Sequence, residues 1–217
     1  MKANLPTVKR PQSLGEEIAN SISHGIGLII ALIALPVLVI GATRRGDASN
    51  IFGASVFALS LVLLYLASTL YHALPANKAK RLFQVFDHAA IFLLIAGTYT
   101  PFTLGVLRGV WGWTLLILVW GLAIVGILMK AIGGVRYPML STCLYVGMGW
   151  VAVIAAQTIW QRMPVAGIAW VLAGGVAYTA GVGFFAAERV RYSHFVWHLF
   201  VLAGSVCHIV AVFWYAA

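Results

Sequence analysis

The chain has 217 residues, of which 62% are hydrophobic and only 9% are charged. Soluble domains carry about a quarter of charged residues, so this composition excludes a soluble globular domain and a toxin that is soluble before it inserts. The formal net charge of +9 is explained by basic residues placed beside anionic lipid, which predicts membrane lipids and no nucleic acid as partners.

Seven apolar runs follow one another along the chain, and each has about the twenty residues that a 30 Å hydrocarbon core requires. A membrane-spanning strand needs only about ten residues of alternating polarity, so the length of the runs predicts helices. The expected fold is an all-α bundle of seven transmembrane helices, with 1–217 as one membrane domain and 1–18 as its N-terminal segment. The predicted spans are about 14–42, 51–74, 86–107, 110–130, 137–160, 165–187 and a last run after Arg191.

Local signals refine the first and sixth of these helices. Ser13 and Glu16 have the spacing of a capping box, which predicts a helix start near Leu14. Pro36 predicts a kink further along the same helix. The sixth run carries four glycines that are expected to allow close helix approach, namely Gly174, Gly175, Gly181 and Gly183.

Basic residues are divided unequally between the two sides of the predicted bundle. Ten lie on the side of the N-terminus and of the loops after the second, fourth and sixth helices, and four lie on the other side. The positive-inside rule therefore predicts a multi-pass plasma or inner membrane protein with a cytoplasmic N-terminus and an outside C-terminus. The ten are Lys2, Lys9, Arg10, Lys78, Lys80, Arg81, Lys130, Arg136, Arg189 and Arg191, and the four are Arg44, Arg45, Arg108 and Arg162.

Four ionisable residues from three predicted helices are expected at one depth. His194 and His198 are four residues apart at the start of the last helix, so their rings project from one face, about 40° apart. In the predicted topology, His72 ends the second helix and Asp87 starts the third, each roughly 5–10 Å inside the nearest basic residue. Ionisable groups inside apolar segments are costly, so this convergence near the cytoplasmic face predicts a functional site.

The residue types predict a zinc site. His72, His194 and His198 are the expected ligands, because three protein ligands with an open fourth position are typical of catalytic zinc. Zinc lowers the pKa of a bound water from about 15.7 to about 7. Asp87 is expected to accept a hydrogen bond from that water or to act as the general base, and Ser68 to bond the water or an oxyanion. Two plainer interpretations stay open, a helix-start carboxylate for Asp87 and a packing residue for Ser68.

Four short motifs occur in order from the first predicted helix to the last. They are Glu17-x-x-Asn20-x-x-x-His24, Ser68-x-x-x-His72, Asp87 within the run from Phe86 to Pro101, and His194-x-x-x-His198. Each motif is weak alone, but in this order and at this membrane depth they resemble the hemolysin III family, the bacterial branch of the progestin and adipoQ receptor superfamily. The resemblance covers nearly the whole chain and implies a seven-helix fold with zinc near the cytoplasmic face.

The resemblance also relates the chain to intramembrane alkaline ceramidases, which use a similar set of serine, aspartate and three histidines. The open three-histidine site with Asp87 and Ser68 predicts a zinc-dependent hydrolase of a lipid amide or ester, with the lipid taken from the inner leaflet. No obligate protein partner is predicted. The long N-terminal extension of the animal receptors is absent, so hormone binding is not implied. Glu17, Asn20 and His24 are expected to brace the cytoplasmic mouth of the site.

Two other functions stay open beside the hydrolase. One is a cytolytic or pore-forming hemolysin, and the other is a membrane-lipid homeostasis or receptor-like protein in which zinc is structural. His88 is expected at the interface, since it points about 100° away from Asp87. His208 lies roughly 20 Å deeper than His194, either as a core histidine bonded to a neighbour, which we favour, or on the wall of a polar cavity.

Overall fold

The computed structural model describes residues 10–187 and 189–217, and every regular element among them is a helix. Seven spans are long and apolar enough to cross a membrane, so the chain is an all-α, multi-pass membrane protein, as predicted. Residues 1–9 of the predicted N-terminal segment, with Lys2 and Lys9, lie outside the described residues. The helices are α1 Leu14–Arg45, α2 Ala48–Ala73, α3 Lys78–Leu104, α4 Val110–Gly133, α5 Pro138–Trp150, η1 Val151–Ala155, α6 Ala156–Arg162, α7 Val165–Ala186 and α8 Ser193–Tyr215.

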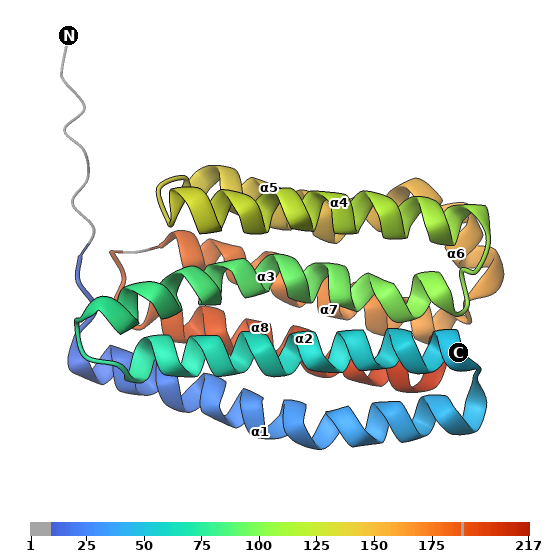
Figure 1. The fold of residues 1–217 in the computed structure, drawn as a ribbon, viewed down its shortest axis with the longest axis horizontal. Helices are drawn as coiled ribbons and strands as arrows, with labels where there is room; N and C mark the ends of the chain where they lie inside the picture. Colours follow the sequence, from blue (N-terminus) through green and yellow to red (C-terminus); the bar gives the residue numbers. More distant parts are fainter. Residues whose placement is uncertain (1–9, 188) are drawn as a thin grey trace, which may run out of the picture.

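The helices pack largely in chain order (Figure 1). α1 packs on α2, α2 on α3 and α3 on α4, whereas α7 and α8 form a pair and α8 returns to α1. α2 is the central helix, because 56% of its most apolar window is buried, against 33% for α1 and 17% for α7. The start of α1, the end of α2 and the starts of α3 and α8 share one end of the bundle, and the C-terminus lies at the other.

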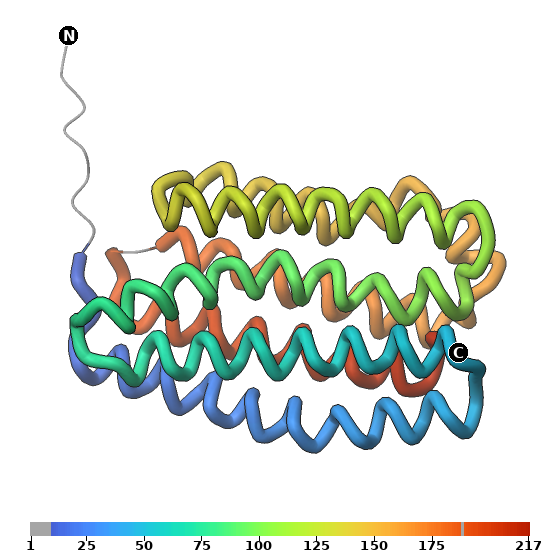
Figure 2. Tube along the Cα trace, viewed as in Figure 1, coloured from blue at the N-terminus to red at the C-terminus, as the bar shows by residue number. Residues whose placement is uncertain are grey.

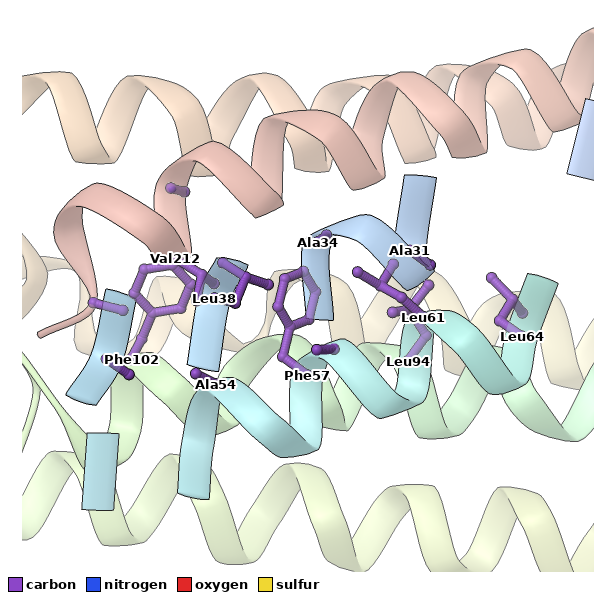
Figure 3. Packing of buried hydrophobic residues seen from close by; sticks show 14 of the residues in the cluster. Ala31, Ala34, Leu38, Ala54, Phe57, Leu61, Leu64, Leu94, Phe102 and Val212 are labelled. Carbon is purple, nitrogen blue, oxygen red and sulfur yellow. The ribbon is translucent and has the colours of Figure 1, made fainter. Parts of the chain in front are cut away.

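The apolar core lies where α1, α2, α3 and α8 meet (Figure 3). Ala31 and Ala34 of α1 are almost completely buried, and Phe57 and Leu61 of α2 lie close to them. Lipid is as apolar as these side chains, so helix association in a membrane depends on close packing rather than on burial from water. The alanines therefore bring α1 close to the central helix.

The first helix begins where the sequence predicted. The Glu16 N–H donates to Ser13 Oγ at 3.4 Å, and the Ser13 N–H donates to the Glu16 carboxylate at 2.8 Å, which completes the capping box. Pro36 lies inside α1 and has no N–H to donate to the carbonyl of Leu32. The trace in Figure 2 shows α1 changing direction along its length.

The third helix begins earlier than predicted, at Lys78 rather than near Phe86. The Lys80 N–H donates to the Asn77 side chain at 2.9 Å, so Asn77 caps the helix and the basic run after it forms the first turn. Asp87 is consequently the tenth residue of α3. The interpretation of Asp87 as a helix-start carboxylate is therefore wrong.

The fifth span is interrupted, although the sequence predicted one continuous helix. α5 ends at Trp150 and a short 3₁₀ segment joins it to α6. The Tyr99 hydroxyl of α3 donates to the carbonyls of Met148 and Gly149, both at 2.9 Å, and accepts from the Ala152 N–H at 3.0 Å. One side chain on another helix thus bonds backbone groups on both sides of the break.

Two of the four glycines of α7 allow close approach. A Cβ on Gly174 would meet the ring of His208, and one on Gly181 would meet Trp197. A Cβ on Gly175 or Gly183 would have no atom within 4 Å. The glycine pattern therefore identified the helix but not which of its faces packs.

Candidate metal centre

Three imidazoles converge at the end of the bundle where α1 begins. His72 lies in the last turn of α2, and His194 and His198 lie in the first turns of α8. One nitrogen from each ring lies within 4.8 Å of the nitrogens of the other two. The His72 ring centroid is 5.1 Å from each of the other two centroids, which are 4.6 Å from each other. This cluster can hold one metal ion.

Glu17 fixes the orientation of His72. The Glu17 Oε2 atom lies 2.7 Å from His72 Nδ1, and Glu17 Oε1 lies 3.0 Å from Lys80 Nζ. A carboxylate at this distance accepts a hydrogen bond from Nδ1–H. The proton therefore stays on Nδ1, and the lone pair of Nε2 is left for a metal. His72 Nε2 is buried and has no hydrogen-bond partner among the described residues. Its orientation therefore suits a metal ligand.

The backbone of α1 orients His198 in the same way. His198 Nδ1 lies 3.2 Å from the Asn20 carbonyl and 3.0 Å from Ser23 Oγ, whose own proton goes to the Asn20 carbonyl at 2.9 Å. A carbonyl only accepts, so Nδ1 carries the proton and Nε2 keeps its lone pair. α1 thus provides a backbone carbonyl for one histidine and a carboxylate for another.

The start of α8 is tied to α1 through Glu16. Tyr192, directly before α8, has a left-handed backbone with φ of 58°, and its N–H donates to Glu16 Oε1 at 2.8 Å. Arg10 Nη1 donates to Glu16 Oε2 at 2.9 Å, and this hydrogen bond raises the pKa of the Arg10 guanidinium. The first turns of α8, with both histidines, are thereby fixed against α1.

The donor set fits zinc. Neutral imidazole nitrogens are common zinc ligands, and each ligand histidine normally gives its other N–H to a carboxylate or carbonyl. His72 and His198 have such partners, Glu17 and Asn20 respectively. Imidazole also binds copper, iron and nickel, so the fit defines a site for a transition metal, among which zinc is our expectation.

Ser68 lies one turn before His72 and is completely buried. Its Oγ has no hydrogen-bond partner among the described residues. Other helical hydroxyls donate to the carbonyl one turn back, as Thr69 does to Tyr65 at 2.6 Å and Thr98 to Leu94 at 2.8 Å. Buried hydroxyls are normally bonded, so the Ser68 hydroxyl one turn from His72 has an unused hydrogen bond.

Asp87 is 7% exposed and lines the same cavity as His194 and His198. Its Oδ2 lies 3.7 Å from His88 Nδ1, which is 2.8 Å from the Gln84 carbonyl. The structure thus brings Asp87 to the centre without including it among the three clustered ligands. Its predicted role as the base stays a prediction.

His24 contacts the centre by ring stacking. Its ring lies parallel to that of His198, with centroids 3.4 Å apart, and meets Tyr65 edge-on. Both of its nitrogens are buried without a hydrogen-bond partner among the described residues. Asn20 has two contacts, since its carbonyl faces His198 and its side-chain amide donates to Gln12 at 2.7 Å. The three residues expected to brace the site all lie against it.

Sequence reasoning missed Ser23 and Lys80, which touch His198 and Glu17 respectively. Ser23 follows Asn20 by three residues, so helical spacing gave a signal for it. Lys80 gave a misleading signal, because it was assigned to a loop that forms the first turn of α3. Its ammonium also donates to the carbonyls of Tyr71 and Leu74 at the end of α2.

A cavity of about 430 Å³ leads from the metal centre into the bundle. Asp87, His194 and His198 line it near the metal centre, and Phe102 lines it farther along α3. Asp87 and Phe102 are fifteen residues apart on α3, so the cavity extends roughly 22 Å along that helix. Its walls come from α3, the fifth span, α7 and α8, and most lining side chains are apolar.

One family model and several known proteins match this chain. A family model described as "Haemolysin-III related" matches residues 12–209. "Hemolysin-3" of Bacillus cereus is 45% identical over 204 residues, which cover 94% of this chain and 93% of that protein. "Hemolysin-3 homolog" of Bacillus subtilis (strain 168) is 42% identical over 203 residues, covering 94% and 95%. "Monocyte to macrophage differentiation factor" of Homo sapiens is 24% identical over 210 residues, covering 92% and 84%.

Proposed function

This chain belongs to the haemolysin-III related family, and we propose that it is a zinc-dependent hydrolase of a lipid amide or ester. The observation that carries the proposal is the position of three clustered imidazoles at the head of a long apolar cavity. Ligand sites are typically apolar cavities of about 300–1,000 Å³ with a few convergent polar groups, and this cavity has that size and that polarity.

We assign His72, His194 and His198 as the zinc ligands. Zinc bound there supplies a Lewis acid that polarises a carbonyl and makes water more acidic. Glu17 and Asn20 hold the imidazoles of His72 and His198 in the tautomer that keeps a nitrogen lone pair directed away from α1. These two residues therefore position the ligands and do not touch the substrate.

We assign the two remaining polar groups to the reaction itself. Asp87 accepts a proton from water as the water oxygen attacks the carbonyl carbon of the lipid, and later returns that proton to the leaving nitrogen or oxygen as its bond to carbon breaks. The unbonded Ser68 hydroxyl donates to the carbonyl oxygen, on which negative charge develops. Both groups are buried, which strengthens these interactions relative to water.

The apolar cavity holds the acyl chain of the substrate. Leu94, Ile95 and Phe102 line it below the metal centre, so an alkyl chain can extend from the reacting carbonyl towards the middle of the membrane. The positive-inside count of ten basic residues against four supports an orientation with this centre near the cytoplasmic face of the cell membrane. The lipid would then enter from the inner leaflet.

The proposal is tested with protein purified in detergent, by metal analysis and by turnover of a panel of ceramides, acyl amides and esters. We expect about one zinc per chain and hydrolysis of at least one class, with both lost in His194→Ala. His88→Ala is the matched control, because His88 lies at the same end of the bundle outside the three-histidine cluster, and it should keep its zinc. If wild type carries one zinc per chain, and neither wild type nor His194→Ala turns over any substrate, the hydrolase proposal is wrong.

The names of the two Bacillus relatives favour cytolysis as the second candidate. Liposomes that contain purified protein distinguish the two, because pore formation releases a trapped dye without any chemistry on lipid. Leakage that is unchanged in His72→Ala would favour the pore. A third outcome, loss of thermal stability on zinc removal with no activity to lose, would make the metal structural.

A further inference from the structure

A second polar cluster lies beside the cavity, deeper along α8 than the zinc ligands. The Tyr65 hydroxyl of α2 donates to Ser205 Oγ of α8 at 2.7 Å, and the Tyr178 hydroxyl of α7 lies 3.0 Å from the same oxygen. The ring of His208 stacks on that of Tyr178 with centroids 5.5 Å apart. Tyr178 and His208 both line the cavity, so this cluster faces the space that leads from the zinc ligands.

The distance between the two polar sites follows from α8. His208 is ten residues after His198, which is a rise of roughly 15 Å. The apolar residues Val201 on α8 and Leu94 on α3 line the cavity between the two levels. A lipid chain that begins at the metal centre and follows the cavity would therefore meet Tyr178 and His208 partway along its length.

The hydroxyl groups of this cluster have one proton too many. Tyr65, Tyr178 and Ser205 carry one hydroxyl proton each, and the two hydrogen bonds that join them use two of the three. Because Tyr65 donates to Ser205, the third proton belongs to either Ser205 or Tyr178. A buried donor without an acceptor costs about 1–3 kcal/mol, so an acceptor oxygen on a bound molecule would stabilise the cluster.

His208 adds a second unmet requirement. It is 6% exposed, and its Nδ1 has no hydrogen-bond partner among the described residues. The expectation of a core histidine bonded to a neighbour is therefore not met, and the cavity-lining alternative describes its position. Gly174 provides the room, since a Cβ there would lie 2.6 Å from His208 Nε2. Polar groups at this depth in a membrane are costly to keep without a function.

We propose that Tyr178, Ser205 and His208 form a subsite for a hydroxyl group carried partway along the chain of a bound lipid. A hydroxyl both accepts and donates hydrogen bonds. A single hydroxyl can therefore accept a hydrogen bond from the surplus proton of the cluster and donate one to the imidazole nitrogen of His208. It is also neutral, and it enters an apolar cavity at much lower cost than a charged headgroup. The subsite rests on the lipid-binding part of the proposed function and does not depend on hydrolysis.

Equilibrium binding to the purified full chain tests the subsite. Two saturated fatty acids of equal length, one with a mid-chain hydroxyl and one without, displace a fluorescent fatty acid from the cavity. We expect the hydroxylated acid to bind about fivefold tighter, the gain typical of one net hydrogen bond. An acid with its hydroxyl beside the carboxyl group should show no such gain, because its hydroxyl stays at the level of the metal centre.

Two variants and two controls locate the effect. His208→Phe keeps an aromatic ring and Tyr178→Phe removes one hydroxyl, and each should abolish the preference for the hydroxylated acid. Thr98→Val removes a cavity-lining hydroxyl that already donates to Leu94, so the preference should persist. It should also persist in His194→Ala, where any hydrolysis is lost. Melting curves identify a variant that fails to fold, and the other variant then decides.

The outcomes separate this inference from the proposed function. Equal binding of the two acids to wild type, as a permanently bound water in the cluster would give, overturns the hydroxyl subsite and leaves the hydrolase standing. A preference that survives in both folded variants overturns it as well. If neither acid binds, the cavity is not a lipid site, and the subsite fails together with the acyl-chain assignment. A preference without turnover on any substrate supports the subsite and removes the hydrolase.

Discussion

The two sides of the bundle differ in how closely their helices pack. On the side of α1, α2, α3 and α8, a Cβ on Gly53 would lie 2.7 Å from the Pro101 backbone, and one on Gly27 would meet the Tyr65 ring. On the side of the fifth span and α7, Gly174 and Gly181 pack against α8, but a Cβ on Gly147, Gly149, Gly175 or Gly183 would have no atom within 4 Å. Only 17% of the most apolar window of each of these two spans is buried, against 56% for α2.

The polar groups follow the same division. All three histidines, with Glu17, Asn20, Ser68 and Asp87, lie on the closely packed helices. The loosely packed side contributes mainly the wall of the cavity, and its fifth span is interrupted by a 3₁₀ segment. Metal ligands need fixed geometry. Helices that form the wall of a lipid cavity must instead move apart to admit the lipid. The difference in packing therefore matches the division of work that we propose.

The largest expected effect is on metal binding at the packed side. His72→Ala should lower the metal content of the purified protein from about one ion per chain to near zero, because two imidazoles alone hold zinc weakly. Thr179→Val, which changes the wall on α7, should leave the metal content unchanged. Elemental analysis after dialysis measures both, and equal metal in the two variants would contradict the division.

Glu17→Gln should weaken metal binding without abolishing it. The neutral amide is a weaker hydrogen-bond acceptor for His72 Nδ1–H than the carboxylate. Loss of such a partner typically costs 10–100-fold in metal affinity. Competition with a chelator gives the dissociation constant. Asp47→Asn, at the opposite end of the bundle, is the control, and an equal loss there would show that the effect is not local.

A pair of glycine substitutions tests the packing itself. Gly53→Ala should lower the free energy of unfolding by about 1–3 kcal/mol, because the new methyl group meets the Pro101 backbone, which cannot move aside easily. Gly183→Ala should raise it by about 0.5–1 kcal/mol, since alanine favours the helix and meets no atom. Unfolding in detergent measures the difference, and effects of the same sign would break the comparison.

Tyr99→Phe should lower the stability of the fifth span without changing the metal content. It removes the hydroxyl that bonds Met148, Gly149 and Ala152, so we expect about 1–2 kcal/mol of lost stability. Hydrogen exchange should rise in the fifth span, while the metal content stays at the wild-type level. Metal loss in this variant would show that the two sides are not independent.

The smallest expected effect concerns the end of the bundle opposite the metal centre. Hydrogen bonds from Arg108 lower the pKa of Asp47 from 3.8 to about 2. Since the pKa is lowered in the folded state, the pair contributes its stability above about pH 4 and loses it as the pH falls through about 2. Asp47→Asn keeps the helix cap but not the charge, so its melting temperature should vary less than that of wild type in this window.

The sequence determined the all-α class, the seven apolar spans and the residues that could bind a metal. These properties follow from local physics: span length is set by the thickness of the membrane, and the spacing of His194 and His198 is set by the helical repeat. The order of spans along the chain also placed His72 and Asp87 at the same end of the bundle as this pair. Convergence of the three histidines therefore followed once the topology was assigned.

Tertiary structure decided what depends on contacts between distant segments. The hydrogen bonds at the interruption of the fifth span come from Tyr99, about fifty residues earlier in the chain, so they could not be read from the span itself. The partners of His72 and His198 lie on α1, more than fifty residues away in sequence, so the tautomers could not be read from α2 or α8 alone. The cluster of Tyr65, Tyr178, Ser205 and His208 likewise exists only because α2, α7 and α8 pack together, since a hydrogen bond between helices has no sequence period of its own.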